Sequence, residues 1–353
     1  MRPLVFFVLF LSVLAPGFSQ TAVGSDASLP NDPRAILSAA LPFYDFSSPE
    51  LKPWHLKATY QFYNLKGKPT EQGTWEYWWA SPKVYRSSWT RAGAEYTTWS
   101  TAEGTVYRKG TEGHLRYFET TIDNTLLSPL PGRVLLESAK MKLDLKMLPP
   151  DKPALACVIA SPGRLGDRKL EAAIPDMARD YCFDPQTMAL RIVYSDPLTT
   201  RYGQLVKIEG RYLARQVVVQ YGNQTLFSVS VDTIEGFNPT DPAFSPPADA
   251  VLEKAAPQGN VQGGVMVGSL VKKTIPDYPL MSKMNHEQGL VVLAAVIGTD
   301  GRVHYLEVLA SPSPLLADSA VDAVKKWQYK PYLLNGQPVE VETMVKVYFN
   351  LGR

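Results

Sequence analysis

The chain has 353 residues, a length typical of about two domains, and its 45% hydrophobic and 20% charged residues suit ordinary folded cores. Its 36 Lys and Arg residues nearly balance 34 Asp and Glu residues, and the resulting net charge of +2 argues against a nucleic acid or a strongly acidic partner. The 29 prolines indicate many loops and at least one linker.

Residues 1–19 have the features of an export signal. Arg2 precedes an apolar run over 4–14, and the small residues Gly17 and Ser19 stand at the −3 and −1 positions of a cleavage site. The run is shorter than the roughly 20 apolar residues that a membrane helix needs. We therefore expect a cleaved signal peptide, with a retained inner-membrane anchor as the alternative.

Residues 20–32 are small and polar and are expected to be disordered, whereas 33–237 predict a β-rich N-terminal domain. A short helix is expected first, at 33–44. Turn-forming residues about every eight to twelve positions then favour a meandering antiparallel sheet. The expected strands cover 54–63, 71–80, 83–90, 94–100, 104–109, 114–119, 153–160, 179–183, 187–194, 204–209, 211–221 and 224–234. Hydrophobic spacing over 133–147 favours a helix instead.

Aromatic residues are concentrated in the first of these strands. They are Trp54, Tyr60, Trp75, Tyr77, Trp78, Trp79, Tyr85 and Trp89. Two interpretations stay open: the rings line a ligand cavity, or they form the sheet core and cross-strand pairs, since aromatic residues favour strands. Because Trp78 and Trp79 are adjacent, their rings must face opposite sides of a strand, and one of them must meet solvent, a lid or a ligand.

This region resembles the lipoprotein-carrier fold of the LolA type. The resembling segments are 54–63, the aromatic-rich second strand, 81–86, and 181–185 followed by Leu190-Arg191. That family folds as a curved antiparallel sheet, a half-barrel, with a helical lid over an apolar cavity. The resemblance therefore implies a second possible function, that of a periplasmic carrier of lipids or lipoproteins.

The chain has two cysteines, Cys157 and Cys182, and each lies in a predicted strand. Export permits a disulfide. A metal or redox pair is the alternative, but no histidine lies near either cysteine. We expect a structural disulfide, provided that the fold brings the two residues together.

No residue pattern predicts an enzyme, a metal site or a cofactor. The histidines, His55, His114, His286 and His304, form no pair with metal-ligand spacing. Asp300 precedes a glycine, which indicates a turn rather than a catalytic acid. The serines lie in no nucleophile elbow, and no glycine-rich phosphate loop follows a strand.

Residues 238–263 are rich in proline and glycine and predict a linker to a C-terminal domain over 264–353. In that domain, Asp300-Gly301 between two apolar runs predicts a hairpin turn. A helix capped by Ser313 runs to Trp327, and Pro331 follows it. The order is strand, strand, helix, strand. The whole chain is therefore expected to be α+β, with an antiparallel N-terminal domain and a small β-β-α-β domain.

This order, with these residues, resembles the TonB C-terminal domain over about residues 264–352. The matching positions are Tyr278, Pro279, Gly289, Asp300, Gly301, Trp327 and Pro331. The resemblance implies a periplasmic module that binds the N-terminal peptide of an outer-membrane transporter and receives force from inner-membrane motor proteins. The chain departs from that family in one respect, because a folded domain stands where a membrane helix and a longer spacer are usual.

The last predicted strand, 341–349, is the candidate binding site. The residues expected to bind the partner are Val341, Glu342, Thr343, Met344, Val345, Lys346, Val347 and Tyr348. In a three-stranded sheet the chain end can form an edge, and a partner peptide can add there as another strand. The alternatives are that Glu342 and Lys346 guard the edge, or that the edge pairs with a second copy of the chain.

Overall fold

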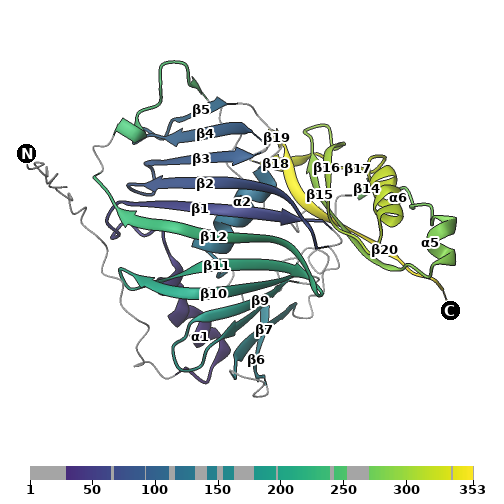
Figure 1. Ribbon diagram of the computed structural model, residues 1–353, viewed down its shortest axis with the longest axis horizontal. Helices are drawn as coiled ribbons and strands as arrows, with labels where there is room; N and C mark the ends of the chain where they lie inside the picture. Colours follow the sequence, from purple (N-terminus) through teal and green to yellow (C-terminus); the bar gives the residue numbers. More distant parts are fainter. Residues whose placement is uncertain are drawn as a thin grey trace, which may run out of the picture.

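The computed structural model describes residues 29–64, 67–91, 93–110, 116–131, 141–148, 154–162, 179–195, 198–238, 242–252, 270–334 and 337–352. The predicted signal peptide, most of the expected disordered segment, and parts of the expected helix at 133–147 and of the linker lie outside these residues. Within them, the chain forms a large antiparallel sheet and a smaller sheet domain with a helix, as predicted (Figure 1).

The N-terminal domain is built on one 13-stranded sheet with the order β13-β5-β4-β3-β2-β1-β12-β11-β10-β9-β8-β7-β6. Its strands are β1 Trp54–Tyr63, β2 Pro69–Trp79, β3 Tyr85–Arg91, β4 Ala94–Ser100, β5 Val106–Gly110, β6 Met141–Met147, β7 Ala156–Pro162, β8 Asp180–Phe183, β9 Leu190–Ser195, β10 Leu198–Ile208, β11 Arg211–Tyr221, β12 Gln224–Gly236 and β13 Val251–Leu252. Two meanders of sequential strands meet where β1 pairs with β12. The predicted meander is therefore confirmed.

Helices lie on one side of this sheet. They are α1 (Pro33–Ala40), which continues into η1 (Leu41–Tyr44), and α2 (Arg116–Leu127) (Figure 1). Asp32 caps α1, because its carboxylate accepts a hydrogen bond of 2.6 Å from the Ala35 N–H. The core lies between the helices and the sheet, and it includes Ile36, Leu37, Leu56, Ile122, Leu126 and Trp54.

Two predicted elements were wrong. Part of the expected strand at 114–119 belongs to α2, and 141–147 of the expected helix at 133–147 form β6. In β6, the apolar residues alternate with Lys142, Asp144 and Lys146, which is the period of a strand. β6 pairs with β7, and Leu143 of β6 lies opposite Ala160 of β7. This pairing favours a strand over a helix.

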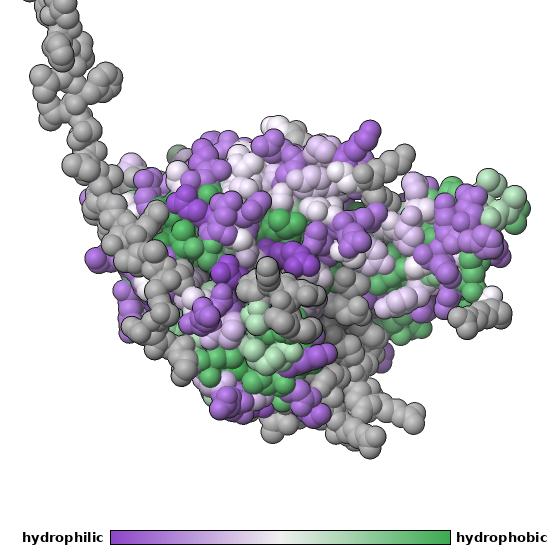
Figure 2. Space-filling model, turned by 60° about the horizontal axis from the view of Figure 1, so that its bottom comes forward, coloured by the Kyte–Doolittle hydropathy of each residue, from purple (hydrophilic) through white to green (hydrophobic). Residues whose placement is uncertain are grey.

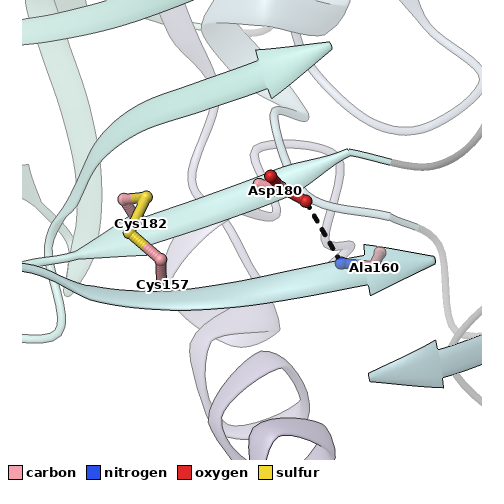
Figure 3. Close-up of a disulfide and its surroundings, with 4 residues drawn as sticks. All are labelled: Cys157, Ala160, Asp180 and Cys182. Carbon is pink, nitrogen blue, oxygen red and sulfur yellow. Dashed lines mark hydrogen bonds between the residues drawn. A yellow bond between two sulfur atoms is a disulfide. The ribbon is translucent and has the colours of Figure 1, made fainter. Parts of the chain in front are cut away.

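Cys157 and Cys182 occupy directly opposite positions on β7 and β8 and form a disulfide. Their Cα atoms are 4.0 Å apart (Figure 3). Leu155 and Ile192 surround the bridge in a small apolar cluster of their own. The predicted disulfide is confirmed, and it links the neighbouring strands β7 and β8.

Part of the predicted linker packs against the N-terminal sheet. Residues Pro242–Phe244 form η2, and β13 (Val251–Leu252) pairs with β5. The Trp99 indole donates a hydrogen bond of 3.0 Å to the Ala243 carbonyl, and Lys109 lies 2.9 Å from Asp249. This segment therefore covers the outer side of β5.

The C-terminal domain contains a three-stranded sheet with the order β16-β15-β20. Its elements are β14 Leu270–Lys272, α5 Leu280–Met284, β15 Gly289–Ile297, β16 Val303–Ala310, α6 Pro314–Val324, β17 Gln328–Tyr329, β18 Tyr332–Leu334, β19 Gln337–Val339 and β20 Val341–Phe349. Ser313 caps α6 by accepting a 3.3 Å hydrogen bond from the Leu316 N–H. The expected β-β-α-β order is present, with short additional strands.

Both faces of β15 are buried, each against a different partner. Val291 and Leu293 pack in one cluster with α6, whereas Leu290 and Val292 belong to the core of the N-terminal domain. Figure 1 shows the small sheet at one end of strands β1–β3. The two domains are thus in direct apolar contact.

An ion-pair group joins the domains beside this contact. The Arg91 guanidinium, at the end of β3, pairs with Glu71 and donates a hydrogen bond of 3.2 Å to Glu307 on β16. The Tyr305 hydroxyl donates a hydrogen bond of 3.2 Å to the same Glu307. Burial raises the pKa of Glu307.

Candidate functional site

The candidate site is the free side of β20. In the described sheet, β20 pairs with β15 over its whole length, from Val341 opposite Ile297 to Phe349 opposite Gly289, and it ends the strand order. The backbone groups that point away from β15 therefore have no strand partner among the described residues. Such an edge accepts another extended chain.

Side chains on β20 alternate as predicted. Val341, Thr343, Val345, Val347 and Phe349 are all buried. On the other side, Met344 and Lys346 are half-buried, and Tyr348 is 66% exposed. The side chain of Glu342 lies outside the described residues. Met344 packs against the N-terminal core. On this side of β20, Tyr348 is therefore the exposed side chain among the described residues.

Tyr278 and Phe349 hold the end of β20 in place. Their rings make an edge-on contact with centroids 5.4 Å apart. The Tyr278 hydroxyl donates a hydrogen bond of 2.5 Å to the Glu287 carbonyl, and Pro279 directly precedes α5. The Tyr-Pro pair therefore connects the segment before α5 to the last strand.

Gly289 and Gly301 occupy backbone positions that favour glycine. Gly289 has φ +137°, and an added Cβ would lie 2.8 Å from Pro312. Gly301 has φ +76°, and a Cβ there would collide with the Tyr329 carbonyl. Asp300 accepts a hydrogen bond of 2.9 Å from the Arg302 N–H, which lowers the pKa of its carboxyl. The predicted turn at 300–301 is present.

Trp327 lies under the small sheet and is 6% exposed. Its indole N–H donates a hydrogen bond of 2.8 Å to the Thr274 carbonyl. Pro331 follows β17 and lies beside the Gly301 turn, where its ring would contact an added Cβ at 3.4 Å. The family-motif residues thus support the sheet, and none of them lies on the free side of β20.

Three apolar side chains that the sequence reasoning did not single out are exposed on α5. They are Leu280, at 72%, Met281, at 54%, and Met284, at 65%. Figure 2 shows hydrophobic surface at the far end of the C-terminal domain. α5 directly follows the Tyr278-Pro279 pair, and the Tyr278 ring packs on Phe349 at the end of β20.

The aromatic strands of the N-terminal domain are mainly core. Trp54, Trp75, Trp79 and Trp89 are buried in one cluster. Trp78 lies on the opposite face of the sheet, where it stacks on His55 at 4.4 Å and Arg86 lies over its ring at 4.3 Å. Trp78 is thus the ring of the adjacent pair that leaves the core.

No group of metal-binding side chains is present in the described part of the chain. Burial lowers the pKa of His55, which lies 3.5 Å from Glu235. His304 lies 3.1 Å from Asp300 at the hairpin turn, and His286 is on the surface, while His114 falls outside the described ranges. No described helix is both long and apolar enough to span a membrane.

Residues 274–351 match the model of the family described as Gram-negative bacterial TonB protein C-terminal. One similar solved structure is the TonB C-terminal domain of Pseudomonas aeruginosa, which is 26% identical over 24% of this chain and 86% of that chain, with a TM-score of 0.22. The predicted resemblance of the C-terminal domain is confirmed.

Other similar structures cover the N-terminal region. A LolA superfamily protein from Nitrosomonas europaea is 9% identical over 63% of this chain and 99% of that chain, with a TM-score of 0.35. A DUF1329 family protein from Desulfovibrio piger is 10% identical over 62% of this chain and 97% of that chain, with a TM-score of 0.37. No curated protein matches the chain.

Proposed function

We propose that the C-terminal domain binds an extended peptide by adding it as a strand to β20. The observation that carries this proposal is the position of β20 at the end of the strand order, with no second strand partner among the described residues. The TonB family match supports the N-terminal segment of an outer-membrane transporter as the peptide. Residues Val341 to Tyr348 would supply the backbone contacts.

The site suits a partner whose sequence varies. Backbone pairing supplies affinity with little demand on side chains. Selectivity would come from the exposed side chain of Tyr348, together with the exposed apolar side chains of α5.

In this proposal the chain is a periplasmic adaptor. If residues 1–19 are cleaved, the protein acts as a freely diffusing receiver of transporter peptides. If they are retained, the same domain is tethered to the inner membrane, where motor proteins can act on it. Intact mass of the exported protein distinguishes the two forms.

Paired proline substitutions test the edge. N–H groups of successive residues in a strand point to opposite sides, so one of Val345→Pro and Lys346→Pro removes a donor from the free side and the other breaks the ladder with β15. The variant that retains the parent circular dichroism and melting temperature is the informative one. We expect it to bind a synthetic transporter N-terminal peptide at least about tenfold more weakly than the parent.

Three outcomes separate the alternatives. Equal peptide binding by parent and folded edge variant would show that the site lies elsewhere. A parent protein that is dimeric, and becomes monomeric in the edge variant, would show that β20 pairs with a second copy. Binding that falls only in the variant that breaks the β15 ladder would reflect loss of folding rather than loss of the edge.

A further inference from the structure

We propose that the contact between the two domains is a pH-dependent switch, in which Glu71, Arg91 and Glu307 are the switching residues. These three residues form the interdomain charge cluster. The small sheet is held most firmly on the N-terminal domain at acidic pH, and the contact weakens as the pH rises. The proposal concerns the domain contact alone and does not depend on peptide binding at β20.

Two carboxylates share one guanidinium in this cluster. Arg91, at the end of β3, pairs with Glu71 on β2, so both members of this pair belong to the N-terminal domain. Glu307, on β16 of the small sheet, lies 3.2 Å from the same guanidinium. The three side chains are only 17% to 27% exposed. Glu71 already balances the charge of Arg91, so docking of the small sheet adds one excess negative charge to a half-buried site.

The surroundings of Glu307 favour its neutral form. Among the described residues, the ionisable groups that face it are Arg91 on β3, Glu71 on β2 and Tyr305 on β16. Burial has the largest effect and raises the pKa of Glu307, whereas Arg91 and the Tyr305 hydroxyl lower this pKa and the charge of Glu71 raises it again. The net result is a pKa above the ordinary value of 4.5.

Protonation of Glu307 therefore favours docking. When the small sheet is separated, Glu307 is in water and its pKa returns to the ordinary value. Because the docked state holds the proton more tightly, the stabilisation is complete below the ordinary pKa of 4.5 and is lost as the pH rises through the raised value. Arg91 keeps Glu71 as its partner when Glu307 is neutral, so the protonated cluster contains no unpaired charge. A simple salt bridge would show the opposite direction and tighten as its carboxyl group lost the proton.

The cluster lies in line with the apolar part of the domain contact. Glu307 is opposite Ala294 on β15, and Ala294 is opposite Met344 on β20. Met344 packs against the N-terminal core, as do Leu290 and Val292 of β15. The charged and the apolar contacts therefore lie on the same surface of the small sheet, and a change at Glu307 affects how firmly this whole surface is held.

A buried alanine of the contact provides the reporter for a test. Ala310, at the end of β16, has no exposed surface and packs in the N-terminal core, so an Ala310→Cys thiol can be alkylated when the small sheet separates from that core. Ala320 on α6 is equally buried but packs within the small domain, so an Ala320→Cys thiol reports unfolding of that domain. Both reporters are placed in the full-length protein with its disulfide intact.

Alkylation by iodoacetamide is measured at several pH values. Each rate is divided by the rate of the same variant in urea at the same pH, which removes the effect of thiol ionisation and gives the open fraction. We expect the open fraction of Ala310→Cys to rise at least about threefold between about pH 5 and about pH 8, because docking is linked to a proton. The Ala320→Cys reporter should not show this rise.

Two variants and one control, each combined with the Ala310→Cys reporter, locate the switch. Glu307→Gln fixes the cluster in its neutral form, so its open fraction should stay at the low acidic value of the parent at every pH. Glu71→Gln leaves Arg91 to Glu307 alone and lowers the pKa of Glu307, so it should reduce the pH dependence. Glu235→Gln is the matched control, because the Glu235 side chain is 54% exposed on β12, and it should behave like the parent.

The proposal is overturned if the open fraction is constant with pH, if it increases in acid, or if Glu307→Gln follows the same pH profile as the parent. It is also overturned if the Ala310→Cys thiol is never labelled faster than the Ala320→Cys thiol, since the contact would then not open separately from the small domain. Circular dichroism checks the fold of each reporter, and Leu290→Cys reports the same contact if Ala310→Cys alters the spectrum. Each outcome leaves the β20 proposal unaffected, because peptide binding is measured separately.

Discussion

At the scale of single residues, Asp123 differs most from an ordinary carboxyl group. Burial raises its pKa from 3.8 to about 7. The folded protein therefore holds this proton more tightly than the unfolded chain does. The favourable contribution of the protonated group is complete below about pH 4 and is lost as the pH rises from about 4 to about 7.

Asp123→Asn should remove this pH dependence. An amide has no charge to bury, so we expect the variant to be more stable than the parent at pH 8 by about 2–4 kcal/mol and nearly equal to it at pH 4. Urea unfolding at both pH values measures the difference. Equal stability of the two proteins at pH 8 would show that the carboxylate is solvated or neutralised by a bound cation, and removal of such a cation by dialysis at low pH would identify the second case.

Sequence reasoning could not find Asp123, because no local pattern marks it. The side chain whose pKa it affects, Tyr77, lies on β2, which precedes α2 in the chain and is joined to it only by the fold. The sequence shows that strands β1, β2 and β3 are rich in aromatic residues. It does not show whether their rings form a core or line a site, because that depends on which elements pack against them. The structure places most of them in the core and brings Tyr77 near one acid.

At the scale of elements, regular alternation decided which predictions succeeded. The expected strand at 54–63 agrees with β1, since Leu56, Ala58 and Tyr60 are buried at every second position. α2 was missed because threonines at 120, 121 and 125 have low helix propensity, so the helix depends on burying Ile122 and Leu126 against the sheet. A helix that depends on packing against the rest of the fold has only a weak helical pattern in its own sequence.

The disulfide between β7 and β8 gives a prediction at the same scale. The bridge closes a loop of sequence separation 25, and its removal should destabilise the N-terminal domain by about 3 kcal/mol. The double variant Cys157→Ser with Cys182→Ser, compared with the parent by urea unfolding, measures this loss. Thiol labelling of the unreduced, denatured parent should find no free thiol, and two reactive thiols would contradict the bridge.

At the scale of the whole molecule, the domain contact changes what a cut in the linker should do. Leu290 and Val292 of the small sheet belong to the N-terminal core, and Arg91 pairs with Glu307 across the contact. Backbone cleavage within 253–263 need not separate the domains, because the linker is not their main connection. Both faces of β15 are buried by these contacts.

We therefore expect the C-terminal fragment, of about ninety residues, to co-elute with the N-terminal domain after limited proteolysis. Arg91→Ala would leave Glu71 and Glu307 close together without their shared cation, and should weaken fragment association at least about tenfold. Arg302→Ala is the control, since its side chain is 75% exposed. Immediate separation of the parent fragments on size-exclusion chromatography would contradict this contact.

The segment that lies along β5 has a practical consequence for dissecting the protein. An N-terminal fragment that stops at residue 237 lacks η2 and β13, so it exposes the backbone of β5 as an open sheet edge and uncovers Trp99. Both this fragment and one that stops at residue 252 lack the cover of Leu290 and Val292, but only the shorter one opens β5. We therefore expect the shorter fragment to self-associate at lower concentration. Light scattering on the two fragments makes the comparison, and equal self-association would show that these few residues do not protect the sheet. We therefore propose that an N-terminal fragment should extend at least to Leu252, fifteen residues beyond the position that the proline-rich composition indicates.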